Sequence, residues 1–188
     1  MLTSKQCSLL LRLARESIQN YFENKKTLLP KEKNFQEKKG VFVTLREKGR
    51  LRGCIGLPYP RLPLGEAVVH AAKAAAFSDP RFPPLCKKEL DKLEIEISIL
   101  TEPREINIKK ESDIKKIKPG RDGIIIYYHG YSGLLLPQVA TEYKMNAKQF
   151  LEATCQKAGL SKDAWKMEGC KILTFQAQVF SEKKKNKK

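Results

Sequence analysis

The sequence predicts an α+β fold in which a mainly antiparallel sheet is flanked by helices. Short apolar runs of strand type occur in adjacent pairs with a turn between them, and each pair is followed by a helical segment and one more strand-like run. This order of hairpin, helix and strand occurs twice, over about residues 41–101 and 123–180. We therefore expect one domain over residues 1–182, made of two subdomains, and a basic tail at 183–188.

The first predicted element is a helix over residues 4–22, because apolar side chains recur there at helical spacing and Ser4 can cap its start. The residues expected on its buried face are Cys7, Leu11, Ala14, Ile18 and Tyr21. The next segment, 23–39, is charged, contains a proline and has little periodicity, so it is predicted to be a loop.

The strand pattern of the first subdomain begins at Val41. VFVTL and RLRGCI form a predicted hairpin around REKG, where Gly49 can adopt a positive φ. A helix is predicted over LGEAVVHAAKAAAF, and the prolines of SDPRFPPL end it. Its expected buried stripe is Leu64, Val68, Ala71 and Ala75. LEIEISILT then alternates aliphatic and polar residues, which is typical of a half-buried strand.

The second subdomain repeats this order. GIIIYY and GLLLPQ are predicted strands around the turn HGYS, which contains His129. The helix NAKQFLEATCQKAGL follows, with Asn146 as its N-cap and Gly159 as its stop signal, and KILTFQAQVF is the last strand.

The composition indicates an anionic partner. The formal net charge is +16, and the tail KKKNKK carries five of these charges, which leaves +11 for the rest. Basic residues concentrate between Lys25 and Arg52, with a smaller cluster in KKIKPGR. Such a field attracts nucleic acid or a small phosphate-bearing ligand. A lysine-rich solvated surface explains the same charge without any ligand.

Other classes of protein are disfavoured. The five cysteines are scattered and form no Cys-x-x-Cys pair, which argues against a disulfide framework and against a metal site. No apolar run approaches the roughly 20 residues of a membrane helix, and Arg12 and Arg15 interrupt the first apolar stretch, so we expect a cytoplasmic protein that does not bind membranes. GxxxxGK[ST], GxGxxG and GxSxG are absent, and the sequence does not specify whether a cofactor is bound or which one.

The stretch LRGCIG is the first candidate site. If Leu51 and Ile55 point into the core, strand alternation places Arg52 and Cys54 together on the opposite face. A guanidinium beside a thiol favours the thiolate and makes it a better nucleophile. His70, in the alanine-rich helix, is the candidate partner base, with a histidine at the edge of the core as the alternative.

The two glycines of this stretch have two interpretations. Gly53 and Gly56 can let a ligand or another chain approach the backbone closely. Alternatively, they mark a β-bulge, and the cysteine packs as a small apolar residue.

Three further polar residues are candidates for binding. Asp79 and Arg81 flank Pro80 in a loop stiffened by prolines, where they can bind a ligand, pair with each other or cap the helix. Gln138 is expected at the end of the second hairpin, where it can bind a ligand amide or carbonyl, or satisfy loop backbone.

Several motifs together resemble the AMMECR-one domain family. They are LRGCIG, AFSDPRFPPL, LEIEISILTEP, GLLLPQVA, FLEATCQKAGL and FQAQVFSE, in this order from about Ser4 to Glu182. The resemblance implies two β-rich halves around a barrel-like sheet, with a cleft beside LRGCIG. Matching the motifs gives the suspected functional residues Arg52, Gly53, Cys54, Ile55, Gly56, Asp79, Arg81 and Gln138. Tyr143 stands where the family commonly has tryptophan, which puts an aromatic contact there in doubt.

Two functions follow as hypotheses, and the sequence favours the first, because polar motifs such as SDPRF and LLPQV exceed what a charged surface needs. The first is an enzyme or enzyme subunit in which Cys54 is the nucleophile or a thiolate ligand, Arg52 stabilises negative charge and His70 carries a proton. The resemblance adds Memo-like and radical-SAM proteins as possible partners and implies no particular reaction. The second is a non-catalytic module that binds RNA or a protein partner through the basic surface.

Overall fold

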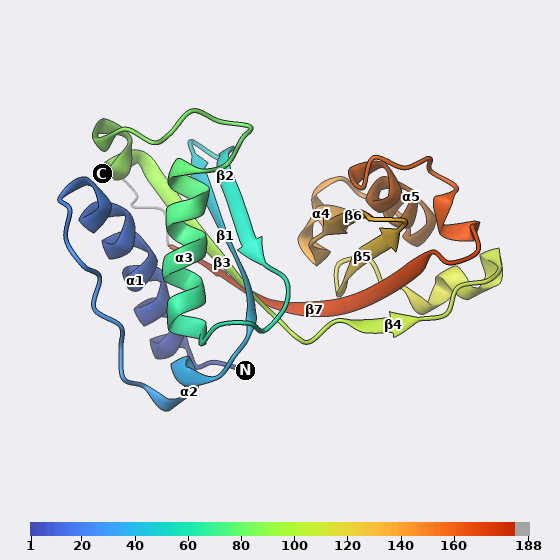
Figure 1. Ribbon diagram of the computed structural model, residues 1–188, viewed down its shortest axis with the longest axis horizontal. Helices are drawn as coiled ribbons and strands as arrows, with labels where there is room; N and C mark the ends of the chain where they lie inside the picture. Colours follow the sequence, from blue (N-terminus) through green and yellow to red (C-terminus); the bar gives the residue numbers. More distant parts are fainter. Residues whose placement is uncertain (183–188) are drawn as a thin grey trace. The chain divides into compact units, whose positions relative to one another are not determined.

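Two separate hydrophobic cores organise the chain, which is shown as a computed structural model in Figure 1. The structure describes residues 1–182. Unit 1 consists of Met1–Leu100 and the C-terminal residues from Gln178, and unit 2 consists of Thr101–Ala177.

Helix α1 (Ser4–Phe22) opens unit 1 and has the predicted bounds. Its cap is Thr3, one residue before the predicted Ser4. The Thr3 hydroxyl accepts from the Gln6 amide while the Gln6 side chain accepts from the Thr3 amide, so both free amides are satisfied. Tyr21 was expected on the buried face and is 52% exposed, because its ring stacks on Phe77 rather than entering the core.

The segment predicted as a loop, 23–39, contains the short helix α2 (Lys33–Gln36). The burial of Phe35 against the core of unit 1 provides the packing that the local pattern did not indicate. The burial of this aromatic ring stabilises a short helix although the segment has little helical periodicity.

Strands β1 (Gly40–Glu47) and β2 (Arg50–Leu57) form the predicted hairpin. Lys48 and Gly49 both have positive φ in its turn, as two-residue hairpin turns require. β1 also pairs antiparallel with β3 (Leu93–Leu100), so the order in unit 1 is β2, β1, β3, and β2 is an edge strand.

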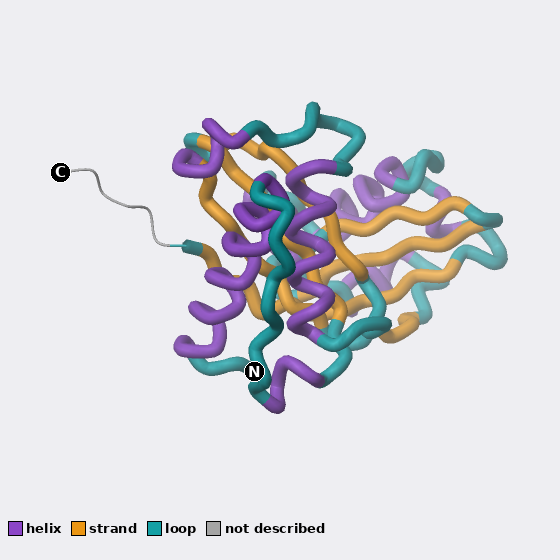
Figure 2. The backbone as a smooth tube through the Cα atoms, turned by 60° about the vertical axis from the view of Figure 1, so that its left-hand side comes forward, coloured by secondary structure: helices purple, strands orange, loops and turns teal. Residues whose placement is uncertain are grey.

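Helix α3 (Leu64–Phe77) lies beside α1, and the two helices cover the same face of the unit 1 sheet (Figures 1 and 2). The predicted stripe of α3 is buried, as are alternate residues of the strands beneath it, namely Val41, Val43, Leu45, Ile95 and Ile97. A short 3-10 helix, η1 (Lys87–Lys92), leads into β3.

Unit 2 is built on a second hairpin, β5 (Asp122–Tyr128) with β6 (Tyr131–Leu135). β5 pairs with β7 (Lys171–Ser181), which also pairs with the short β4 (Arg104–Ile106). The remaining elements are η2 (Glu111–Lys116), α4 (Pro137–Glu142), α5 (Ala147–Lys157) and η3 (Ala164–Lys166). Asn146 caps α5 as predicted, and Gly159 beyond its end has a φ of +77°.

The predicted α+β class with a mainly antiparallel sheet is confirmed. Hairpin, helix and strand follow one another in both units. The units differ from the expected ranges at β7, whose last residues belong to unit 1 because Phe180 packs on its core. The predicted basic tail lies outside the described residues.

Candidate functional site

The candidate site lies on β2, where the register against β1 shifts. Leu45 pairs with Gly53 but Arg46 pairs with Leu51, so Arg52 is an extra residue in a β-bulge. The extra residue changes the face of the sheet to which the residues before Gly53 point. Leu51 is consequently 38% exposed, whereas the sequence predicted it in the core. Ile55, beyond the bulge, packs on the core as predicted.

Gly53 lies beneath α3 and has no room for a side chain. A Cβ atom at this position would lie 2.1 Å from the carbonyl oxygen of Ala75. The close approach that the sequence indicated is therefore made by a helix of the same chain. Gly56 pairs with Phe42 across the hairpin, and a Cβ there would meet the phenyl ring at 2.3 Å.

Asp79 and Arg81 bind the free edge of β2 at Cys54. The Asp79 carboxylate accepts a hydrogen bond from the Cys54 amide at 2.8 Å, and the Arg81 Nη2 donates to the Cys54 carbonyl at 3.2 Å. The two side chains also pair with each other through Arg81 Nε and Nη2, at 2.9 and 2.7 Å. They occupy the place that a neighbouring strand would take, and we call this arrangement the edge clamp.

The loop after α3 holds the edge clamp in position. The Phe82 amide donates to the Asp79 carbonyl, and the Leu85 amide donates back to the Ala76 carbonyl of α3. Leu85 is buried in the core of unit 1. The Asp79 side chain is only 1% exposed, whereas that of Arg81 is 43% exposed, so the clamp presents a guanidinium to solvent. Its hydrogen bonds from Arg81 hold the pKa of Asp79 at about 2.

The Cys54 thiol lies on the side of the sheet shared with Thr44, whose hydroxyl donates to the sulfur at 3.3 Å. Burial raises the pKa of the thiol, an effect larger than the lowering by Thr44 and Arg81. The positive charge that acts on the sulfur is thus that of Arg81, whereas the sequence indicated Arg52. At neutral pH the cysteine is held as a neutral thiol.

Arg52 is engaged elsewhere. Its Nε and Nη2 donate to the two carboxylate oxygens of Glu89 in η1, at 2.7 and 3.2 Å, and its side chain is 12% exposed. The bidentate pair is the main cause that lowers the pKa of Glu89 to about 2. The bulge is what frees Arg52 from the strand ladder to make this contact.

The remaining predicted residues are dispersed. His70 lies on α3 outside the buried stripe and is exposed. Within the described residues it makes no hydrogen bond to Cys54. Gln138 belongs to unit 2 and is the second residue of α4, because Pro137 starts a helix where a strand end was expected. Residues 1–182 contain no group of three or more His, Cys, Asp or Glu side chains placed to hold a metal ion. None of their helices is both long and apolar enough to cross a membrane.

Two surface hollows of about 310 Å³ each lie on unit 1. One is lined by the start of α1 and the end of β7, including Cys7 and Gln178. The other lies along α1 beside residues 28–32. Neither of these two borders LRGCIG, and the cleft implied by the resemblance stays a prediction.

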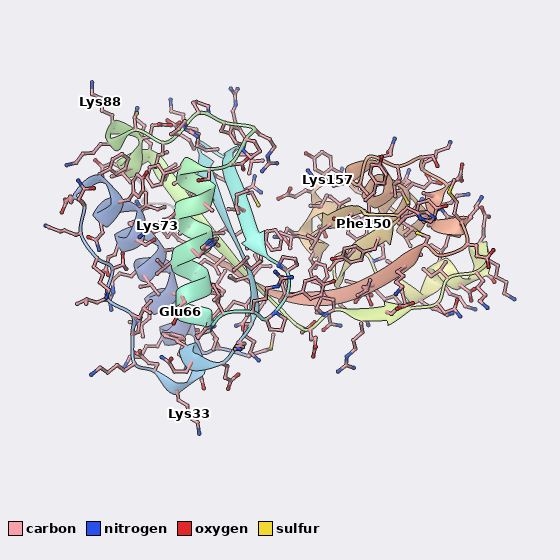
Figure 3. All side chains as sticks on the ribbon, viewed as in Figure 1. Lys33, Glu66, Lys73, Lys88, Phe150 and Lys157 are labelled. Atoms are coloured by element: carbon pink, nitrogen blue, oxygen red, sulfur yellow. The ribbon has the colours of Figure 1, made fainter. Side chains whose placement is uncertain are left out.

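A second feature of unit 1 is a basic surface that the sequence indicated only in part. Figure 3 shows Lys33 and Lys88 at opposite ends of unit 1, since the chain after α1 runs back along that helix to α2. The predicted cluster between Lys25 and Arg52 is therefore divided between two ends.

One of these ends collects basic residues from separate segments. Tyr21 stacks on Phe77, which brings the ends of α1 and α3 together, and the charge of Lys87 acts on Glu23. The hairpin turn joins them because Glu47 pairs with Leu93, directly after η1. We call this surface the basic end, and its exposed members are Lys25, Lys26, Lys48, Arg50, Lys87 and Lys88. Among residues 1–182, only Lys25 of these six has a carboxylate partner, Glu23.

Sequence reasoning missed Thr44, Glu89 and the basic end. The signal for Thr44 is incomplete, because counting outward from the hairpin turn pairs Cys54 with Val43, and only the bulge at Arg52 makes Thr44 its partner. Glu89 has no comparable signal, since the loop that brings it to Arg52 is irregular. The basic end depends on how four segments meet, which no local pattern specifies.

Comparison with known proteins identifies the family. Residues 11–180 match the AMMECR1 family. The chain belongs to the AMMECR1 family. The predicted resemblance is thereby confirmed, and LRGCIG and the edge clamp are features of an AMMECR1 chain.

Individual AMMECR1 relatives match over nearly their full length. Protein MJ0810 of Methanocaldococcus jannaschii is 46% identical over 97% of this chain and 92% of its own. Protein Ta0236 of Thermoplasma acidophilum is 49% identical over 92% and 85%, respectively. The crystal structure of the uncharacterized protein PH0010 from Pyrococcus horikoshii is similar with a TM-score of 0.89 and 45% identity, covering 93% of this chain and 90% of that one. None of the three is named for an activity.

Proposed function

We propose that the chain is a non-catalytic binding module for phosphate-bearing polymers, with RNA as the principal candidate, and that the basic end is its binding surface. The observation that carries this proposal is the gathering of lysine and arginine from the segment after α1, the hairpin turn and η1 at one end of unit 1. Exposed cations without carboxylate partners are available to phosphate oxygens.

The edge clamp adds to this surface. Arg81 lies in the loop between α3 and η1, and its guanidinium is partly exposed although it is anchored by Asp79. An anchored guanidinium loses little side-chain freedom on binding and suits a phosphate group. In this proposal LRGCIG shapes the edge strand on which the clamp rests.

The enzyme hypothesis for Cys54 has less support from the geometry. Burial keeps the thiol protonated, and Arg52 is committed to Glu89. His70 is exposed on α3, and among residues 1–182 it makes no hydrogen bond to Cys54. A neutral thiol without a base is a poor nucleophile. A Memo-like or radical-SAM protein partner stays a prediction.

Fluorescence anisotropy with labelled single-stranded RNA and with inorganic polyphosphate tests the proposal. We expect both polymers to bind, with affinity falling as salt rises, by roughly 0.7 in log K per log salt for each phosphate contacted on a single strand. The double variant Lys87→Glu with Lys88→Glu should weaken binding to both polymers and reduce the slope. Lys157→Glu with Lys162→Glu, on exposed residues of unit 2, makes the same change in net charge and serves as the control.

The basic tail is tested separately by a chain that ends at Glu182. Binding that persists in this chain but is lost on charge reversal in η1 supports the basic end. If the two double variants weaken binding equally, or neither polymer binds at physiological salt, the proposal is wrong.

A further inference from the structure

An exposed aromatic ring lies within the basic end, at the last turn of α1. The Tyr21 and Phe77 rings stack with centroids 3.9 Å apart and planes 21° apart. Phe22 meets Phe77 edge-on at 5.3 Å. Phe22 and Phe77 are half-buried against the core of unit 1, so they hold the tyrosine on a fixed support.

Tyr21 keeps more than half of its surface exposed although Phe77 covers one face of its ring. Because Phe77 covers one face, we infer that the opposite face and the edge of the ring are the parts that a ligand can reach. A tyrosine that only joined α1 to α3 would gain more by burying both faces. The ring is thus a preformed flat surface open to solvent.

Cations flank this ring. Lys26 follows it by five residues in the sequence, Lys25 pairs with the neighbouring Glu23 carboxylate at 2.8 Å, and Lys87 lies close enough to act on the same carboxylate. Aromatic rings bordered by lysines are the combination by which proteins bind single-stranded nucleic acid, with bases stacked on the rings and phosphates on the cations. Polyphosphate has no bases, so it can bind only the cations and not the ring.

We propose that Tyr21 is a stacking platform for an unpaired nucleobase, and that the ligand of the basic end is a single-stranded polynucleotide. This inference rests on the proposed function and makes it specific. Double-stranded nucleic acid offers no free base face along its length, so it would engage the lysines without the ring. The ligand must carry both unpaired bases and phosphates, and RNA and single-stranded DNA both do.

The test uses the full chain with fluorescein-labelled 12-residue oligo-U and oligo-dT, and with inorganic polyphosphate as competitor. Tyr21→Leu removes the aromatic ring but retains apolar contact with Phe77, and Tyr21→Trp retains the stacking surface. Loss of one stacked base should weaken oligonucleotide binding by roughly fivefold to 100-fold in Tyr21→Leu, and Tyr21→Trp should bind like the original chain. Binding of polyphosphate should be unchanged in both variants. The control is Tyr143→Leu, which removes an exposed tyrosine from unit 2.

The outcomes separate the two proposals. If polyphosphate and oligonucleotides bind but Tyr21→Leu changes neither affinity, the stacking platform is wrong and the proposed function stands. If Tyr21→Leu weakens the binding of polyphosphate and of oligonucleotides equally, the stacking platform is also wrong, because the ring would then affect binding only by supporting the structure of the basic end. If neither polymer binds to the original chain, both proposals fail.

A spectroscopic measurement reports stacking directly. The Tyr21→Trp variant adds one indole to the tryptophan fluorescence of the original chain. Quenching of this added fluorescence by unlabelled oligo-U, without quenching by polyphosphate, supports direct stacking, and equal quenching by both polymers contradicts it. Similar affinities for oligo-U and oligo-dT would show that the site does not distinguish the two sugars.

Discussion

The Asp79 carboxylate accepts a hydrogen bond from the Cys54 backbone amide at 2.8 Å, on the edge of β2 that no strand within residues 1–182 pairs. Arg81 completes the contact by donating to the Cys54 carbonyl. An open strand edge exposes backbone groups that promote pairing with other chains, and a charged pair that satisfies them prevents it. The two motifs singled out in the sequence, LRGCIG and SDPRF, are therefore one structural unit.

Breaking this unit should destabilise the protein. Asp79→Asn keeps an oxygen that can accept from Cys54 but removes the charge that Arg81 pairs with, so we expect unfolding in urea at neutral pH to become easier by about 1–3 kcal/mol. Asp163→Asn breaks the exposed pair with Lys166 and should cost at most about 1 kcal/mol. Equal losses in the two variants would contradict the edge clamp.

The stability of the folded protein should also decrease at acidic pH, over a defined pH range. Arg81 lowers the pKa of Asp79 from 3.8 to about 2, and Arg52 lowers the pKa of Glu89 from 4.5 to about 2. A carboxyl whose pKa is depressed in the folded state stabilises that state above its unfolded pKa, and the contribution is lost as the pH falls toward the folded value. We expect the free energy of unfolding to decrease between about pH 4.5 and pH 2.

Urea unfolding across this pH range measures the effect. The slope should be shallower in Asp79→Asn than in the original chain, since the asparagine does not titrate. An unchanged slope in Asp79→Asn would show that the pair with Arg81 does not cause the loss of stability at acidic pH.

The sequence predicted those parts of the fold whose causes are local. The bounds of α1 and α3 follow from helical spacing and from prolines, and the hairpin turn follows from Gly49. The glycines of LRGCIG allowed a bulge as one of two interpretations, and the structure has one, but its position at Arg52 was not indicated by the local pattern. One extra residue in the strand was enough to turn Leu51 outward and to move the guanidinium away from Cys54.

The two units share one more feature that the predicted repeat did not include. The second strand of each hairpin carries a glycine where a helix crosses it: Gly53 beneath α3, and Gly133 beneath α5, where a Cβ would lie 2.5 Å from the Ala158 amide nitrogen. Each helix lies so close to its strand that only a glycine fits. The site residues depend instead on contacts distant in sequence, such as Arg52 with Glu89, which the pattern of one segment cannot specify.

The close approach at Gly53 leads to a test with a matched control. Gly53→Ala places a methyl group against the Ala75 carbonyl, and α3 can relieve the overlap only by moving off the sheet, so we expect a loss of about 1–3 kcal/mol or more. Gly65→Ala, within α3, meets nothing closer than 3.8 Å and should be stabilising by about 0.5–1 kcal/mol. Thermal and urea unfolding of the two variants should therefore change in opposite directions. A neutral Gly53→Ala would mean that α3 does not lie against β2 as described.

The reactivity of Cys54 distinguishes a structural role of the LRGCIG motif from a catalytic one. Burial raises the pKa of its thiol, whereas Cys86 is exposed at the start of η1. Since the thiolate is the reactive form, Cys54 should react with iodoacetamide near pH 7 well below the rate of Cys86, and mass spectrometry of peptides over time measures both rates in one sample. In urea the two rates should become similar, because unfolding removes the burial that suppresses ionisation of Cys54. Faster alkylation of Cys54 than of Cys86 in the folded protein would instead require an activating group and would restore the enzyme hypothesis.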